Sequence, residues 1–126
     1  MGYRSEVVLA IDAKIVPALM TAFAKCEETQ KLCTQHVDNL DTDYEGAGNW
    51  LMRWDHIKWY DSFPDVAMIE KFIEGLDSDD LSEFGLKSEE PLAELYKFVR
   101  IGEDMDDSES RGYGFEDIYI SRGISF

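Results

Sequence analysis

Acidic residues are concentrated in one part of this 126-residue chain, between residues 61 and 109. This stretch holds 16 Asp or Glu residues against four Lys or Arg residues, which gives it a net charge of −12. The whole protein carries −15, so most of the excess negative charge lies here. Like charges repel one another and disfavour a compact state. A fold with this sequence must therefore hold these side chains beside a well-built apolar core.

Enough apolar sequence is present to build such a core. Hydrophobic residues make up 44% of the chain and aromatic residues 13%, which excludes wholesale disorder. A chain of this length buries roughly two thirds of its unfolded surface, and we expect a single domain, residues 1–126. No apolar run is long enough to span a membrane, and the N-terminal residues lack the features of a signal peptide. We therefore expect a cytoplasmic protein.

Hydrophobic periodicity predicts two helices. Apolar residues recur at helical spacing from Ala13 to Cys33, which indicates one amphipathic helix with Asp12 as a good cap. Pro17 lies too far in for the first helical position if Asp12 is the cap, so the helix either starts nearer Val16 or is kinked at Pro17. The sequence Ser-Phe-Pro-Asp at 62–65 is a helix-start signal, and a second apolar stripe follows it from Val66 to Leu76. Each stripe needs an apolar surface to cover it.

Four strands are predicted around these helices. The apolar, β-branched run Ser5–Ile11 is typical of a buried strand. Strict alternation over Trp50–Tyr60 places Trp54 and His56 on the same side of a second strand. The other two strands are expected at Lys97–Ile101 and within Phe115–Phe126.

The predicted order β-α-β-α-β-β indicates an α+β fold. Two helices on one face of a four-stranded, mainly antiparallel sheet is the simplest arrangement that buries these stripes. Asp38–Asn49 is rich in turn-forming residues and is expected to be an exposed loop. Asp77–Glu90 is expected to be an acidic insertion, and Gly102–Gly114 a second acidic turn region.

Cysteine and histidine are too few to indicate a metal site or a nucleophilic centre. Cys26, Cys33 and His36 share one predicted helix region, but a structural zinc site needs four ligands and His56 lies elsewhere. His56, beside Asp55, is the better candidate base, yet no nucleophile motif accompanies it. Phosphate-binding glycine loops and a complete calcium loop are also missing from the sequence. We therefore predict no metal, no cofactor and no catalytic residue.

The charge also predicts which partners are suitable. A net charge of −15 repels phosphate backbones and anionic lipid, so we expect neither direct nucleic-acid binding nor membrane binding. A basic protein, above all one whose usual ligand is DNA or RNA, is the expected partner. The alternative is that the acidity only keeps the protein soluble.

Aromatic residues next to the acidic stretch are candidate anchors for such a partner. Most rings in Trp50–Phe63 are expected in the core. One or two that stay exposed would act as aromatic anchors in the binding groove of a basic partner. The full set of candidate partner-binding residues is Trp59, Tyr60, Asp77, Asp79, Asp80, Glu83, Glu89, Glu90, Glu103, Asp104, Asp106, Asp107 and Glu109.

A resemblance to a known group of proteins rests on three segments of the chain. These are MGYRSEV at the start, HIKWYDSFPDV in the middle and FVRIGEDMDD near the end. Together they resemble a group of small acidic proteins encoded by bacteriophages. The resemblance implies no activity and no catalytic residue. It implies a setting in which small acidic proteins block a host machine, some of them by spacing carboxylates like the phosphates of DNA.

The first functional hypothesis is therefore a non-enzymatic phage protein in the host cytoplasm. It would inhibit or redirect a basic, nucleic-acid-binding host protein, as a DNA mimic in counter-defence. Its carboxylates would occupy a phosphate-binding groove, and this binding would be fast and would weaken as salt rises. Two alternatives stay open: a small enzyme or nucleotide-ligand binder with a pocket near His56, and a homo-oligomeric structural protein.

Overall fold

The computed structural model describes residues 3–87, 90–104, 106–120 and 124–125. It shows an α+β fold around a five-stranded antiparallel sheet with the strand order β2-β3-β1-β4-β5. The expected α+β class and antiparallel sheet are confirmed, but the detail differs. The sheet has five strands in place of four, and the strand predicted within Phe115–Phe126 is not one of them, because the described strands there pair only with each other. The strands of this sheet are β1 (Ser5–Ile11), β2 (Asn39–Tyr44), β3 (Asn49–Ile57), β4 (Tyr96–Ile101) and β5 (Ser108–Arg111).

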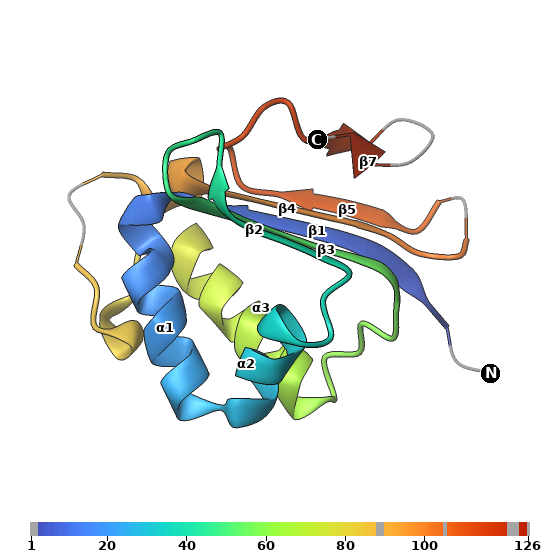
Figure 1. Cartoon of the computed structure of the whole chain (residues 1–126), viewed down its shortest axis with the longest axis horizontal. Helices are drawn as coiled ribbons and strands as arrows, with labels where there is room; N and C mark the ends of the chain where they lie inside the picture. Colours follow the sequence, from blue (N-terminus) through green and yellow to red (C-terminus); the bar gives the residue numbers. More distant parts are fainter. Residues whose placement is uncertain (1–2, 88–89, 105, 121–123, 126) are drawn as a thin grey trace.

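Three helices cover one face of this sheet, where two were predicted (Figure 1). They are α1 (Val16–Lys25), α2 (Glu27–Thr34) and α3 (Pro64–Asp77). Cys26 has an extended backbone, with φ −147° and ψ 103°, which divides the predicted first helix into α1 and α2. Periodicity did not reveal this break because both helices bury apolar residues against the same core. In the described part of the chain, every helix is too short or too polar to cross a membrane.

Short 3₁₀ turns complete the helical structure. The first, η1 (Ala13–Ile15), is capped by Asp12 and precedes α1, so that Pro17 falls in the first turn of α1. A proline there removes no helical hydrogen bond. The second turn, η2 (Ser82–Phe84), lies within the predicted acidic insertion. The third, η3 (Leu92–Leu95), follows just after the insertion ends.

The main core lies between the helices and the sheet. β1 is the central strand, and its side chains Val7, Leu9 and Ile11 are fully buried on the helix side. The apolar stripe that the sequence predicted for α3 is confirmed, since Val66, Ile69, Phe72, Ile73 and Leu76 are all buried.

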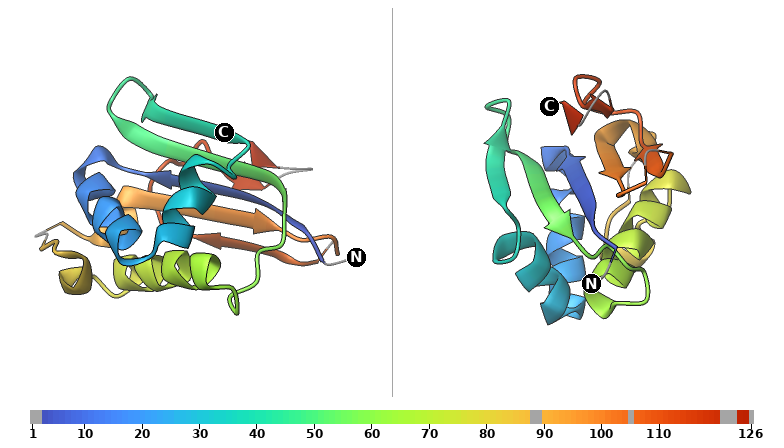
Figure 2. Two further views of the ribbon diagram at one scale, coloured as in Figure 1. Left: turned by 60° about the horizontal axis from the view of Figure 1, so that its bottom comes forward. Right: turned by 90° about the vertical axis from the view of Figure 1, so that its right-hand side faces the viewer.

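A smaller apolar cluster occupies the opposite face of the sheet. Val8, Leu51 and Val99 are buried there, covered by Ile118 and by the partly buried Phe115. Figure 2 shows the chain after β5 on this side, away from the helices. It ends in a separate pair of two-residue strands, β6 (Tyr119–Ile120) and β7 (Ile124–Ser125). β1 is therefore covered on both faces, which explains its continuous apolar run.

The two strands that the prediction missed, β2 and β5, are the edges of the sheet. β2 lies within the predicted loop Asp38–Asn49, and β5 within the predicted acidic turn Gly102–Gly114. Most of their side chains are exposed or half-buried, so neither shows apolar alternation. Backbone hydrogen bonds to one neighbour hold such edge strands in place, and these bonds leave no hydrophobic pattern in the sequence.

A bulge in β3 corrects the predicted placement of His56. Val7 pairs with Trp54, but Ser5 pairs with Ile57, so β3 contains one extra residue at this point. A bulge of this kind reverses the alternation that follows it. Ile57 consequently packs against the main core, while His56 is exposed rather than on the core side with Trp54.

Candidate functional site

A surface hollow of about 550 Å³ lies between α3 and the β4–β5 hairpin. We call it the hairpin hollow. Three aromatic residues line it, Tyr3, Trp59 and Tyr60, together with Ser5 and Ser62. The charged residues of its lining are Asp61, Glu70, Arg100, Asp107 and Glu109. The hollow therefore combines aromatic rings with four carboxylates and one guanidinium group.

Strand register explains why charged groups meet at this corner. Arg100 of β4 lies opposite Val7 on one side and opposite Glu109 of β5 on the other. Val7 is buried beneath the helices, so Arg100 and Glu109 also project from the helix-facing side of the sheet. A charged side chain in such a position needs partners.

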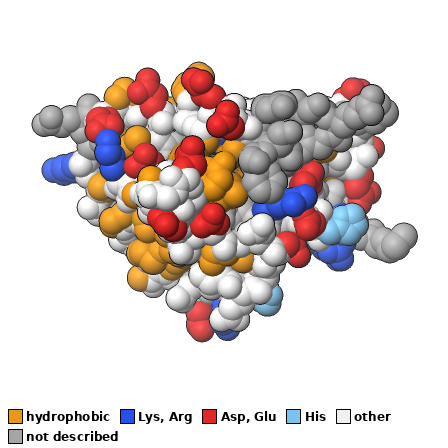
Figure 3. All heavy atoms as spheres, turned by 45° about the horizontal axis from the view of Figure 1, so that its top comes forward, with side chains coloured by type: hydrophobic (Ala, Val, Ile, Leu, Met, Phe, Trp, Pro, Cys, Tyr) orange, Lys and Arg blue, Asp and Glu red, His pale blue; other side chains and the backbone are white. Residues whose placement is uncertain are grey.

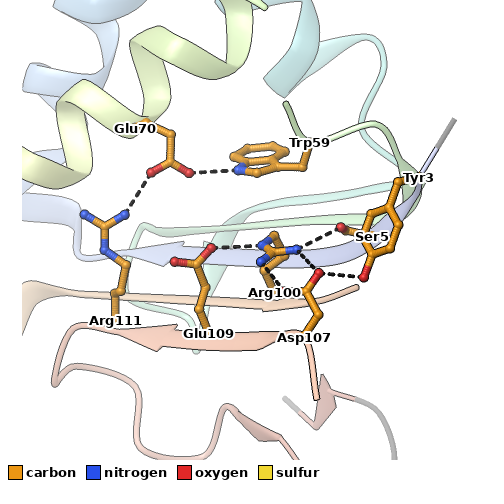
Figure 4. Close-up of polar contacts among 8 residues, drawn as sticks. All are labelled: Tyr3, Ser5, Trp59, Glu70, Arg100, Asp107, Glu109 and Arg111. Atoms are coloured by element: carbon orange, nitrogen blue, oxygen red, sulfur yellow. Dashed lines mark hydrogen bonds and ion pairs between the residues drawn. The ribbon is translucent and has the colours of Figure 1, made fainter. Parts of the chain in front are cut away.

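Arg100 finds these partners with all three of its guanidinium nitrogens (Figure 4). Nε donates to Glu109 Oε1 at 2.9 Å, and Nη2 donates to Asp107 Oδ1 at 2.7 Å. Nη1 donates to Ser5 Oγ and to Asp107 Oδ2, both at 3.2 Å. The hydrogen bonds that Arg100 donates to Asp107 raise the pKa of Arg100 above its usual range. Because every nitrogen is occupied, Arg100 is poorly placed to receive an anionic ligand.

Asp107 is held in its ionised form by the same contacts. The pKa of Asp107 is lowered to about 2. The hydrogen bonds that it accepts from Arg100 are the main cause, and the hydrogen bond from the Tyr3 hydroxyl at 2.6 Å is the second. The ordinary value is 3.8. Tyr3 also accepts a hydrogen bond from the backbone of Asp104 at 3.0 Å, which ties the start of the chain to the hairpin turn.

This lowered pKa predicts an acid-dependent loss of stability. A carboxylate whose pKa is depressed in the folded state stabilises the fold above its unfolded pKa, near 3.8, and that contribution is lost as pH falls toward 2. We expect urea unfolding at pH 5 and pH 2.5 to show a smaller stability difference for Asp107→Asn than for the unmodified protein. Asp106→Asn is the matched control and should keep the full difference. Equal pH dependence in all three proteins would contradict the assignment.

A second charged cluster fastens α3 to the edge strand β5. Arg111 donates to Glu70 Oε2 at 2.8 Å and to Asp77 Oδ2 at 3.0 Å. The Tyr96 hydroxyl also donates to Asp77. Burial, followed by this hydrogen bond, raises the pKa of Tyr96. Glu70 and Asp77 are seven residues apart and so lie on the same side of α3.

The two predicted aromatic anchors occupy different positions. Trp59 is only 9% exposed, and its ring packs against Trp54 at 5.3 Å and Phe98 at 5.8 Å between centroids. Its indole Nε1 donates to Glu70 Oε1 at 2.9 Å, so Trp59 is part of both the core and the hollow (Figure 4). Tyr60 is half-buried and packs against Phe63, which is 39% exposed.

The structure brings part of the predicted site together at one end of the sheet. Trp59, Tyr60, Asp107 and Glu109 line the hairpin hollow. Three further predicted residues lie in the β4–β5 turn beside it and are exposed: Glu103, Asp104 and Asp106. The hairpin hollow and the turn at 102–107 together are called the hairpin end from here on.

The other predicted carboxylates begin at Asp77, near the C-terminal end of α3, seven residues and about 10 Å of helix beyond Glu70 of the hollow. Here Asp79 accepts a hydrogen bond from the Leu92 backbone at 2.7 Å, and Glu83 pairs with Lys71 at 2.7 Å. These contacts hold the segment between α3 and β4 in place. The group consists of Asp77, Asp79, Asp80, Glu83 and Glu90, and Glu89 lies outside the described residues.

Among the described residues, the predicted carboxylates therefore lie toward the two ends of α3, and Arg111 joins the two groups through Glu70 and Asp77. On the face of the molecule drawn in Figure 3, acidic side chains are also scattered, with hydrophobic groups between them.

Sequence reasoning missed several residues of the hollow: Tyr3, Ser5, Asp61, Ser62, Glu70 and Arg100. The seven-residue spacing of Glu70 and Asp77 on a predicted helix was a usable signal for that pair. The contacts of Tyr3 and Ser5 join residues about a hundred positions apart, and no local pattern reveals them.

The metal and catalytic candidates lie elsewhere. His56 is exposed and is not among the lining residues of the hairpin hollow, so a pocket near His56 stays a prediction. Cys33 is buried, which raises the pKa of its thiol, and Cys26 is a second free thiol. Within residues 3–87, 90–104, 106–120 and 124–125, no group of three or more His, Cys, Asp or Glu is placed to hold a metal ion.

The fold and the hollow together describe a small α+β protein with an anionic, aromatic-lined depression beside an edge hairpin. No protein-family model, no curated protein and no solved structure matches this chain.

Proposed function

We propose that this protein is a non-enzymatic binding protein that captures a partner with a basic surface, and that the hairpin end is the capturing surface. The observation that carries the proposal is the charge balance of the hairpin hollow. Among the described lining residues are four carboxylates and one guanidinium group, that of Arg100, which is already bonded to Asp107 and Glu109. Glu70 is also paired with Arg111, which leaves two negative charges in excess. The excess negative charge favours a cationic partner over an anionic one.

Three free carboxylates lie at the hairpin end, beside the hollow. The side chains of Asp61, Asp104 and Asp106 are exposed and have no hydrogen bond or ion pair with any residue that the structure describes. At the opposite end of α3, by contrast, Glu83 and Glu90 are paired with lysines. An unpaired carboxylate keeps its full potential for a partner, whereas a paired one is largely neutralised.

The resemblance to small acidic phage proteins suggests a setting for this capture. In that setting the partner is a nucleic-acid-binding protein of the host, and the hairpin end inhibits or redirects it in the host cytoplasm. The proposal needs only local mimicry of phosphate charge at the hairpin end, because the other predicted carboxylates stabilise the fold.

A matched pair of triple variants tests where the partner binds. Asp61→Asn, Asp104→Asn and Asp106→Asn together remove three charges from the hairpin end. Glu74→Gln, Glu94→Gln and Glu116→Gln remove three exposed charges elsewhere, so both proteins change net charge equally. We expect the first to lower affinity for a captured basic protein about tenfold at low salt, at about 0.5 kcal/mol per charge, and the second to change it little.

The measurement has two stages. The immobilised protein captures host proteins from a lysate at low salt, and each retained protein is then purified and titrated against both variants at several salt concentrations. Affinity should fall as salt rises. If both variants lose affinity equally, overall charge and not the hairpin end is responsible. If no basic protein is retained, the proposal is wrong, and the acidity serves solubility alone.

The homo-oligomer hypothesis stays a prediction. Light scattering of the purified protein at several concentrations tests it directly. A stable oligomer that hides Tyr60 and Phe63 would remove the hairpin hollow from the accessible surface.

A further inference from the structure

We infer that the hairpin hollow is a subsite for one arginine side chain of the basic partner. This inference rests on the proposed function for the source of the arginine, but the chemistry of the hollow supports it separately. The hollow has the size of small-ligand sites, which commonly enclose 300–1,000 Å³, and its volume is about 550 Å³.

The lining suits a cation on an apolar stem. Tyr3, Trp59 and Tyr60 line the hollow, and the methylene groups of a long side chain can pack against aromatic rings. Aromatic faces also attract a cation through the ring quadrupole, and arginine most often fills this role. Carboxylates at the rim then supply the opposite charge.

Two carboxylate positions remain available to such a cation. Asp61 is exposed and has no side-chain bond to the described residues. Glu109 uses Oε1 to accept from Arg100, and its Oε2 accepts no hydrogen bond from the residues that the structure describes. These acceptors come from different parts of the chain, and a planar guanidinium with five donors can satisfy several acceptors at once.

An anion is a poor occupant of the same space. Arg100 is the only cation among the described lining residues, and its three nitrogens already donate to Ser5, Asp107 and Glu109. A phosphate would displace these bonds and face four carboxylates at short range, where like charges repel strongly.

A bare metal ion is also a poor occupant. The described His, Cys, Asp and Glu residues contain no group of three placed to coordinate one. Glu70 is instead turned toward Trp59 and Arg111, each of which donates a hydrogen bond to it. An organic cation with several N–H donors does not need the carboxylates to converge on one point.

Peptide pairs test the inference directly. The probes are acetyl-Gly-Arg-Gly-amide and the same peptide with citrulline, which has nearly the same shape but no charge. Binding is followed by the NMR signal of the Trp59 indole N–H, assigned with Trp59→Phe. The indole of Trp54 is fully buried against Leu32 and serves as the internal reference.

We expect the arginine peptide to shift the Trp59 signal with an affinity on the order of 1 mM, and the citrulline peptide to bind at least about tenfold more weakly. Asp61→Asn should weaken the arginine peptide several-fold, and Glu94→Gln should leave it unchanged. Equal binding of the two peptides, or no shift with either, overturns the inference. Inorganic phosphate or putrescine binding more tightly than the arginine peptide also overturns it, in favour of an anion site or a free polyamine site.

The two proposals can fail separately. If the arginine peptide does not bind, but capture of a basic protein still depends on Asp61, Asp104 and Asp106, the capturing surface is confirmed and the arginine subsite is wrong. If the peptide binds and no basic protein is captured, the hollow recognises arginine and the proposed function is wrong.

Discussion

Trp54→Ala is expected to lower the free energy of unfolding by about 3–5 kcal/mol, as large aromatic-to-alanine changes in a core do. Trp54 has no exposed surface, and its ring packs against Trp59 at 5.3 Å. Its indole Nε1 also donates to the Leu32 carbonyl of α2 at 3.0 Å, and that carbonyl would lose its partner. Since native proteins are stable by only about 5–15 kcal/mol, this change removes a large part of the total.

Urea unfolding followed by circular dichroism measures this loss. Trp54→Phe keeps most of the ring volume but removes the hydrogen bond, so its loss should be smaller, about 1–3 kcal/mol. Tyr113→Ala is the surface control, because Tyr113 is 77% exposed, and its effect should stay within about 0.5 kcal/mol. A loss of less than about 1 kcal/mol in Trp54→Ala would show that β3 and α2 do not depend on this contact.

Gly112→Ala is expected to destabilise the fold by at least about 3 kcal/mol, the sum of backbone strain and overpacking. Gly112 has φ +88°, a conformation that an alanine adopts only with strain. A Cβ atom there would also clash with the backbone carbonyl of Tyr96, and that same carbonyl accepts a hydrogen bond from Gly114 at 2.9 Å. The end of β5 would have to move away from β4.

Gly46→Ala is the matched control for this change. Gly46 also has positive φ, +67°, but an added Cβ would meet nothing within 4 Å. Its loss should therefore be about 1 kcal/mol, the strain alone. Because Arg111 precedes Gly112 and holds Glu70 and Asp77, Gly112→Ala should also weaken any binding at the hairpin hollow. Similar losses in the two variants would contradict the clash.

The buried elements of the fold were predictable because their apolar residues repeat with a structural period. β1, α3 and β4 were predicted to within a few residues, and every predicted core residue of α3 is buried. β2 and β5 were missed because edge strands depend on backbone pairing. The break at Cys26 was missed because two successive helices can continue one apolar stripe.

The candidate site was predictable by residue type but not by position. Aromatic residues next to carboxylates indicated Trp59, Tyr60, Asp107 and Glu109, and these four do line one hollow. Arg100 was counted only as part of the charge balance, although it binds both Asp107 and Glu109. Its role depends on the register between β4 and β5, and no pattern within either strand specifies that register.

The sequence by itself determined the core and the sign of the surface charge. Burial and net charge follow from local periodicity and composition, which any chain segment displays without its neighbours. Tertiary structure decided which carboxylates are free. Asp77 is paired with Arg111, 34 residues away, whereas Asp61 is left unpaired beside the hollow among the described residues. A hydrogen bond requires atoms within about 3 Å, and only the folded chain brings such distant residues that close.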